Sequence, residues 1–338
     1  MSDIQMIEAA ATRLHGEVLK TPLLRSPFLD QLAGRAVWVK AECLQHTGSF
    51  KFRGAWSAVS ALGDCPGILA YSSGNHAQGV ALASQRHNLP AVIIMPEDAP
   101  DLKIQNTRAL GAEVILYDRA GGQRREALGT QIMAERGLTL IKPYDDPYVI
   151  AGQGTTGLEI AEQAAAVGVT KADVLVCCGG GGLSSGIALA LEAKAPGLRV
   201  RPCEPAGFDD MARSLAAGHR LANTQTSGSL CDAILTQMPG ELTFPILHRL
   251  AGPGLVVSDA ACLRAVAQAF LRLKLVLEPG GAAALAAALT HRDDLEGEAV
   301  IVVATGGNVD PPVFAQALET VSNDKGDRPK TIAVAGRP

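Results

Sequence analysis

Short apolar runs rich in β-branched residues recur along this chain, and each one leads into a glycine turn and then into an alanine-rich stretch with helical spacing. Strands that alternate with helices predict parallel sheets covered by helices on both faces. The run Val174-Leu175-Val176 is apolar without interruption, as strands buried on both faces are. The sequence therefore predicts an α/β protein, with strands at residues 68–71, 91–95, 113–117, 174–177, 199–203 and 299–303.

The composition limits the classes of protein to which the chain can belong. A length of 338 residues suffices for two domains, and 47% hydrophobic with 19% charged residues is typical of packed globular proteins. The net charge of -4 provides no basic surface for nucleic acid or membrane lipid. The N-terminus lacks the basic start and apolar core of a secretory signal, no apolar run is long enough to span a membrane, and the seven cysteines show no paired spacing. We therefore expect a soluble, cytoplasmic enzyme that acts on small molecules.

The strands and helices fall into two blocks. One covers residues 47–145 and the other begins near residue 146, with the crossing at Lys142-Pro143-Tyr144-Asp145-Asp146-Pro147. Before them, residues 4–19 have helical apolar spacing that stops near Thr21-Pro22. Residues 323–338 are rich in Lys, Asp, Gly and Pro, which predicts a loosely held tail.

One lysine stands among small residues where a loop turns into a helix. It is Lys51, in the segment Gln45-His46-Thr47-Gly48-Ser49-Phe50-Lys51-Phe52-Arg53-Gly54-Ala55. A lysine in such a place can hold a carbonyl cofactor as a Schiff base. Alone, this pattern is also typical of a solvent-exposed helix start. The Schiff-base interpretation therefore depends on the segments described next.

Four consecutive glycines lie between a predicted strand and a predicted helix at residues 183–194: Gly179, Gly180, Gly181 and Gly182. Their backbone can approach an anion closely, and the amides at the start of the helix can hold a phosphate. A dinucleotide site is the alternative, because Glu204 ends the next strand where a ribose-binding acid would lie. The spacing of Gly180, Gly182 and Gly186 departs from G-x-G-x-x-G, yet an NAD-dependent oxidoreductase stays open at this point.

Two further segments follow predicted strands. Ser72-Ser73-Gly74-Asn75-His76 opens a helix and brings hydroxyl, carboxamide and amide groups together, although it could be an ordinary helix cap. Glu204-Pro205-Ala206-Gly207-Phe208-Asp209-Asp210 groups three carboxylates, the ligands that hard divalent cations prefer. Solvated loop acids are the alternative for this second segment.

Four segments, in chain order, carry a family resemblance: residues 45–55, 71–79, 177–186 and 304–310. They resemble the active-site signature of the fold-type II pyridoxal-phosphate enzymes, and within these the serine/threonine dehydratase (threonine ammonia-lyase) and serine racemase group. The resemblance runs from about residue 15 to 315. It implies a two-domain, tryptophan-synthase-beta-like fold with residues 47–145 as the small domain and residues 1–46 with 146–322 as the large, cofactor-binding domain. It also implies a homodimer.

The resemblance assigns roles to individual residues. Lys51 would carry pyridoxal 5'-phosphate, Thr305 would hydrogen-bond the pyridine nitrogen, and the cofactor would otherwise contact Phe50, Asn75, Gly179, Gly180, Gly181, Gly182, Leu183 and Glu278. The substrate carboxylate would lie on Ser72, Ser73, Asn75 and His76, with Ser73 as the second proton carrier of the racemases. Mg2+, Mn2+ or Ca2+ would be held by Glu204, the Phe208 carbonyl and Asp210. Many members of the family have Ser where this chain has Thr305, a departure that preserves the hydroxyl.

The implied reaction is deamination of a β-hydroxy-α-amino acid such as L-threonine or L-serine by β-elimination of water. A neutral hydroxyl at Thr305 would leave the cofactor a weaker electron sink than a carboxylate would, which favours prompt loss of a β-substituent over transamination. Serine racemase and 3-hydroxyaspartate dehydratase remain alternatives within the family. The NAD-dependent oxidoreductase remains the alternative outside it, although it gives Lys51 and Thr305 no role.

Overall fold

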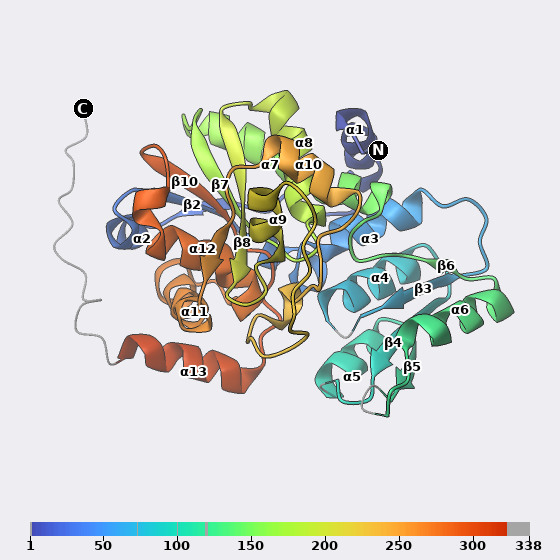
Figure 1. The fold of residues 1–338 in the computed structure, drawn as a ribbon. Helices are drawn as coiled ribbons and strands as arrows, with labels where there is room; N and C mark the ends of the chain where they lie inside the picture. The colour runs from blue at the N-terminus through green and yellow to red at the C-terminus, as the bar shows by residue number, and fades with distance from the viewer. Residues whose placement is uncertain (1, 73, 100, 119–120, 323–338) are drawn as a thin grey trace.

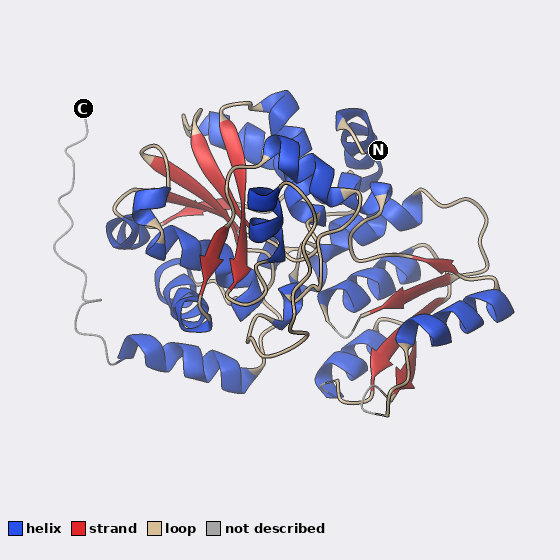
Figure 2. Ribbon diagram, viewed as in Figure 1, coloured by secondary structure: helices blue, strands red, loops and turns tan. Residues whose placement is uncertain are grey.

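The computed structural model describes residues 2–72, 74–99, 101–118 and 121–322. Two sheets, each packed between helices, form the fold (Figures 1 and 2). The mixed α/β class with parallel sheets, predicted from the apolar runs, is confirmed. Within the described residues no helix is long and apolar enough to cross a membrane.

The larger sheet has six strands in the order β1-β2-β10-β7-β8-β9. Every pair is parallel except β1 with β2, which is antiparallel at the edge. The strands are β1 (Leu23–Arg25), β2 (Ala36–Lys40), β10 (Ala299–Val303), β7 (Ala172–Cys177), β8 (Leu198–Pro205) and β9 (Leu255–Val257). Strand β10, near the end of the described chain, therefore lies between β2, near its beginning, and β7.

The smaller sheet has four strands in the order β5-β4-β3-β6, all parallel. They are β5 (Glu113–Tyr117), β4 (Ala91–Pro96), β3 (Ile68–Tyr71) and β6 (Thr139–Leu140). All four come from one continuous stretch of chain, whereas the larger sheet draws on both ends of it. In Figure 1 the smaller sheet lies to the lower right of the larger one.

Alternate residues of the large sheet face two different cores, as the pleat requires. Leu175, Val300 and Val302 pack with helices α2 (Pro27–Ala33), α11 (Asp259–Leu273) and α12 (Pro279–Thr290). Val174, Ile301 and Val303 pack on the opposite face with α7 (Pro147–Ala166), α8 (Gly182–Lys194) and α10 (Thr243–Leu250). Helix α12 is buried along nearly its whole length, and half of its 12 residues are alanine.

A third core packs the smaller sheet and its helices against the helices that cover the larger sheet. It contains Ile7 of α1 (Ile4–Leu14), Phe52 of α3 (Lys51–Ser60), Val80 of α4 (Asn75–Arg86) and Val149 of α7, together with Ile93 of the smaller sheet. The remaining helices are α5 (Asp101–Ala109), α6 (Arg125–Arg136), α9 (Asp210–Ala217) and α13 (Pro311–Ser322), with short 3-10 turns at η1 (Glu42–Leu44), η2 (His46–Gly48), η3 (Asp232–Ile234) and η4 (Arg292–Asp294).

Close approaches of backbone fix where α3 and α8 lie on α7. A Cβ atom at Gly152 would stand 2.4 Å from the Arg53 carbonyl oxygen, and one at Gly186 would stand 2.4 Å from the Ile150 carbonyl oxygen. Only glycine fits at these two crossings. The first turn of α3 is therefore packed directly against α7.

Each of the six predicted strands is present, with ends that differ by up to two residues. One expectation needs correction. The first helix ends at Leu14, not Leu19, because Gly16 adopts a left-handed conformation (φ +79°). The six predicted strands all pair in parallel, and the antiparallel pair is formed by β1 and β2, which were not predicted. The predicted tail, residues 323–338, lies outside the described residues.

Candidate active site

Three neighbouring strands of the large sheet deliver the predicted site residues to one edge. At its carboxyl end, β2 leads through η1 and η2 to Lys51, β10 leads to Thr305, and β7 leads to the glycine turn. Ser49 forms a bridge with Gly306, and the Phe50 amide donates to the Thr305 carbonyl oxygen at 3.1 Å. Ligands of open α/β sheets bind outside the carboxyl ends of the strands, which is where these segments meet.

Lys51 is the first residue of α3, and its side chain is half-buried. Its Nζ donates to the Pro143 carbonyl oxygen at 3.1 Å and lies 5.1 Å from the centre of the Phe50 ring. Burial lowers the pKa of this amine to about 8, against a smaller opposing effect of the Glu278 carboxylate. A larger fraction of the amine is therefore neutral near neutral pH than for an ordinary lysine, as a nucleophile or base requires.

The glycine turn leaves no room for side chains. A Cβ atom at Gly180 would stand 2.2 Å from the Tyr144 ring, and one at Gly182 would stand 2.7 Å from Gln153 Oε1. Gly181 adopts a left-handed conformation (φ +91°) immediately before α8. The amides of the first turn of α8 have no acceptor within the helix, so they are available to an anion at this turn.

A chain of side-chain amides links the two sheets beside Lys51. Asn75, the first residue of α4, donates from Nδ2 to Glu278 Oε1 at 2.6 Å. Its Oδ1 accepts from Asn308 Nδ2 at 2.6 Å, and Asn308 Nδ2 also donates to the Thr47 carbonyl oxygen at 2.8 Å. Burial raises the pKa of Glu278 to about 7, opposed in part by the Asn75 hydrogen bond. The carboxamide of Asn75 is thereby held in one orientation at the edge of the site.

Comparison with known proteins assigns this arrangement to a family. The family described as "Pyridoxal-phosphate dependent enzyme" matches residues 14–306. The chain belongs to this pyridoxal-phosphate dependent enzyme family. The resemblance seen in the four motifs is thus confirmed, as are the fold type and pyridoxal phosphate as the cofactor.

Individual relatives cover nearly the whole chain. L-threo-3-hydroxyaspartate ammonia-lyase from Pseudomonas sp is 39% identical over 322 residues, 94% of this chain and 99% of that protein. Serine racemase from Schizosaccharomyces pombe is 38% identical over 315 residues, 92% of this chain and 96% of that protein. Among solved structures, the T.th. threonine deaminase is 45% identical with a TM-score of 0.86, covering 91% of this chain and 99% of that one.

The residues at this edge fit pyridoxal phosphate. The glycine turn offers free amides to a phosphate, and the Thr236 hydroxyl, next to Gly179, is buried without a hydrogen-bond partner among the residues that the structure describes. The family match includes this turn, so the NAD-dependent alternative is wrong. The two carboxylate oxygens of Glu204 accept from the Met211 and Ala212 amides at 2.9 and 2.7 Å, so this side chain is directed toward the start of α9.

The segment predicted to hold the substrate carboxylate follows β3 of the smaller sheet. Ser72 Oγ accepts from the Gly74 amide at 3.1 Å, and His76 Nε2 donates to the Ile141 carbonyl oxygen at 3.0 Å. Burial lowers the pKa of His76 to about 3, so the ring is neutral. The hydrogen bond from Nε2 connects α4 to Ile141, which directly follows β6. Ser73, the predicted second proton carrier, lies outside the described residues.

Thr305 is buried directly after β10, and its side chain hydrogen-bonds the Cys177 thiol. Burial raises the pKa of that thiol to about 11, so it stays protonated. Leu183 lies in the first turn of α8, and the position of Glu278 immediately before α12 brings it within range of Lys51. The structure thus brings these predicted cofactor residues to one edge of the sheet.

The predicted metal residues lie one strand further along, after β8. Glu204 and Asp210 are buried, and Phe208 lies between them in sequence. Asp210 Oδ1 accepts from Asn223 Nδ2 at 2.7 Å, whereas Oδ2 has no partner among the described residues. Burial, and then the charge of Asp210, raises the pKa of Glu204, and burial raises the pKa of Asp210 to about 6. Across the described residues, no group of three or more His, Cys, Asp and Glu side chains is arranged to hold a metal.

Sequence reasoning missed several groups at the site. It assigned no role to the Pro143 carbonyl, to Tyr144 or to Gln153, all of which border Lys51 or the glycine turn. Asn308 lies in the segment 304–310, which carries part of the family resemblance, but the sequence alone indicated no function for it. A carboxamide directly after paired glycines was the available signal for Asn308, whereas the position of Tyr144 had none.

Proposed function

We propose that this protein deaminates a β-hydroxy-α-amino acid such as L-threonine or L-serine, giving a 2-oxo acid and ammonia. The observation that carries the proposal is the Lys51 amine, with its lowered pKa, at an edge of the sheet shared by Thr305 and the glycine turn before α8. The names of the relatives support the same chemistry, because they include ammonia-lyases that act on threonine and 3-hydroxyaspartate.

Each residue has a defined task in this proposal. Pyridoxal phosphate, when bound, withdraws electrons from the substrate α-carbon. Lys51 would hold the cofactor through Nζ, and the same amine would accept the α-proton of the substrate. The amides of the turn Gly179, Gly180, Gly181 and Gly182 hold the phosphate with Leu183, while Phe50, Asn75, Glu278 and Thr305 flank the ring. Ser72, Ser73, Asn75 and His76 orient the substrate carboxylate.

The test is a substrate panel with a mapped lysine. L-serine, L-threonine and L-threo-3-hydroxyaspartate would each be assayed for oxo acid, and borohydride reduction followed by peptide mapping would locate the pyridoxyl group. We expect it on Lys51, with turnover and the cofactor band near about 410 to 420 nm both lost in Lys51→Ala. A pyridoxyl group on any other lysine would contradict the assignment.

Two alternatives within the family, 3-hydroxyaspartate dehydratase and serine racemase, are represented among the named relatives. A substrate with a second carboxylate needs a cation near the site. Arg125, at the start of α6, pairs with Glu126 at 2.8 Å, and its charge opposes the rise that burial causes in the pKa of Tyr71 and Tyr144. Selective loss of 3-hydroxyaspartate turnover in Arg125→Gln would favour that substrate. Racemase activity would appear as D-amino acid formed faster than oxo acid in chiral chromatography, and Ser73→Ala would then abolish it.

Four further assignments complete the proposal. Residues 47–145 form the small domain and residues 1–46 with 146–322 the large one, supported by the separate sheets. Glu204, Phe208 and Asp210 hold Mg2+, Mn2+ or Ca2+, supported by two buried carboxylates whose pKa values are raised. The protein works as a homodimer in the cytoplasm, supported by the oligomeric habit of such enzymes and by seven cysteines without disulfides.

A further inference from the structure

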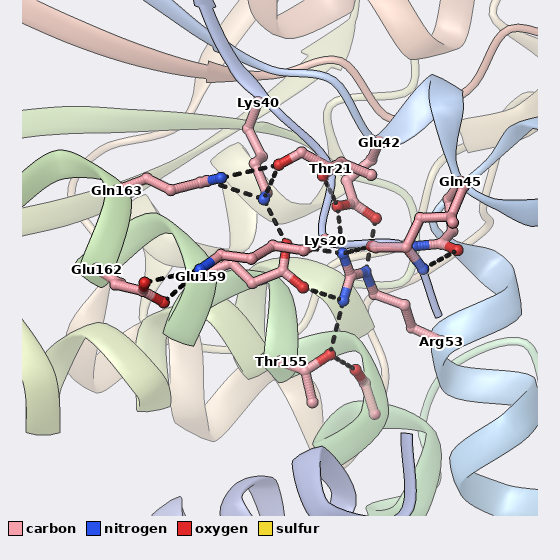
Figure 3. Close-up of polar contacts among 12 residues, drawn as sticks. Lys20, Thr21, Lys40, Glu42, Gln45, Arg53, Thr155, Glu159, Glu162 and Gln163 are labelled. Carbon is pink, nitrogen blue, oxygen red and sulfur yellow. Dashed lines mark hydrogen bonds and ion pairs between the residues drawn. The ribbon is translucent and has the colours of Figure 1, made fainter. Parts of the chain in front are cut away.

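Arg53 lies two residues after Lys51, and its completely buried guanidinium forms ion pairs with two carboxylates (Figure 3). Its Nε and Nη2 donate to the two oxygens of Glu42, both at 2.8 Å. Its Nη1 and Nη2 donate to the two oxygens of Glu159, at 2.7 and 3.0 Å. Paired contacts of this kind fix the plane and the direction of a guanidinium, because both partners are rigid forks.

The remaining contacts complete the coordination of the arginine. Nη1 donates to Thr155 Oγ1 at 3.2 Å and Nη2 to the Leu19 carbonyl oxygen at 3.1 Å. Lys40, at the end of β2, contacts Glu159 and donates to Gln163 Oε1 at 2.9 Å and the Thr21 carbonyl oxygen at 2.7 Å. Two cations and two carboxylates thus share one buried network, so the charges balance.

The network joins the segments around the start of α3. Glu42 belongs to η1, directly after β2, and Glu159 belongs to α7, while Arg53 lies in the first turn of α3. That turn has no cap of its own, since Phe50 supplies no side-chain hydrogen bond and no acidic residue follows. Residues two apart on a helix point roughly 200° apart, so Arg53 reaches into the protein while Lys51 faces the site.

We propose that Arg53 is a positioning residue for the reaction. Its hydrogen bonds to Glu42 and Glu159 fix the position of the first turn of α3, and this turn determines where Nζ of Lys51 lies. This inference rests on the proposed role of Lys51. A buried ion network gains little over apolar packing in stability, but it permits few geometries. Lysine could keep the charge at position 53, but it cannot hold two carboxylates at once through a planar fork.

The decisive comparison is Arg53→Lys with Arg201→Lys. Arg201 is also buried and paired, with Asp173 at 3.4 Å and the Pro253 carbonyl oxygen at 2.9 Å, but Asp173 lies near the amino end of β7, away from the glycine turn. Both variants should melt at lower temperature. We expect kcat to fall roughly tenfold to hundredfold in Arg53→Lys with KM within about threefold, because a small displacement of a catalytic group is costly. In Arg201→Lys, kcat should stay within about twofold of wild type.

A second readout is independent of turnover. Trace acetylation of the full-length, cofactor-stripped protein across a pH series reports the reactivity of the Lys51 amine. In Arg53→Lys the labelling midpoint should rise from about 8 toward that of an exposed lysine, because the amine is no longer held in its buried position. Arg201→Lys should label as wild type does. If Arg53→Lys does not fold, Glu159→Asp, which keeps the carboxylate charge but shortens its reach to Arg53, provides the same two measurements.

The outcomes separate this inference from the proposed function. Equal losses of kcat in the two arginine variants, or unchanged Lys51 labelling in Arg53→Lys, would overturn the positioning role. A wild-type protein with its pyridoxyl group on another lysine would overturn the proposed function instead. An active wild type labelled at Lys51 leaves the proposed function standing whatever the arginine variants do.

Discussion

Two buried glutamates in this protein have pKa values shifted in opposite directions. Glu42 and Glu204 are both fully buried glutamates at the carboxyl ends of strands of the same sheet. Burial alone would raise the pKa of Glu42, but the charge and hydrogen bonds of Arg53 outweigh it and lower that pKa. Glu204 has Asp210 rather than a cation beside it, so its pKa is raised.

The difference lies in the counter-charge and not in the depth of burial. The network around Glu42 is complete within the protein, with each carboxylate matched by Arg53 or Lys40. The pair of Glu204 and Asp210 has only amide donors and leaves one oxygen of Asp210 without a partner among the described residues. A matched network indicates a structural task, whereas the unmatched pair is the observation behind the proposed divalent-cation site.

The largest effect should come from breaking the matched network. Glu42→Gln removes one of the two carboxylate charges that balance the buried Arg53. This loss should lower the free energy of unfolding by about 3 to 5 kcal/mol. Urea unfolding followed by circular dichroism measures this. Glu162→Gln is the control, because its ion pair with Lys20 is exposed and should contribute less than about 1 kcal/mol. Equal unfolding midpoints for the two variants would contradict the contrast between matched burial and exposure.

The unmatched pair should respond to metal instead. After chelation, adding Mg2+, Mn2+ or Ca2+ at about a hundredfold excess over the dissociation constant should stabilise wild type by about 2.7 kcal/mol. Glu204→Gln should abolish this rise in melting temperature. The control Glu241→Gln, an exposed carboxylate, should retain it. If none of the three cations shifts the wild-type melting temperature, Glu204 and Asp210 are unmatched for some other reason.

The smallest effect should come from an ion pair between the two halves of the molecule. Lys103 of α5 donates to Asp232 of η3 at 3.2 Å, and the Asp232 side chain is 61% exposed. Lys103→Met should cost less than about 1 kcal/mol of unfolding free energy, because water screens the pair. Lys194→Met, which removes an exposed pair with Glu8, is the matched control. If Lys103→Met lowered the unfolding free energy about as much as Glu42→Gln does, solvent exposure would not weaken the ion pair of Lys103 and Asp232.

Local patterns account for much of the fold and for the centre of the site. Apolar runs predicted the inner strands because those strands are buried on both faces, and four motifs placed Lys51, the glycine turn and Thr305. Strand β2 was not predicted, because its apolar run is only four residues long and is followed by the charged Lys40. Lys40 can be buried there only because Glu159 pairs with its charge and Gln163 accepts a hydrogen bond from it. Both partners lie more than a hundred residues away in the sequence.

Groups whose role depends on distant partners could not be predicted. The motif around Lys51 contains Arg53, but nothing in the sequence shows that Glu42 and Glu159 converge on it. The Pro143 carbonyl becomes an acceptor for Lys51 only when the chain between the two sheets crosses beside α3. A backbone carbonyl has no sequence signature, so only tertiary structure identifies it.

The order of strands also governs when this protein can become functional during synthesis. Strand β2 cannot pair with β10 until about 260 more residues have left the ribosome. At usual elongation speeds this delay is on the order of ten to fifty seconds. The smaller sheet, made from one continuous stretch, can form during that interval. The nascent chain therefore carries its lysine for most of translation beside an unpaired strand edge, and the last strand both closes the sheet and completes the site.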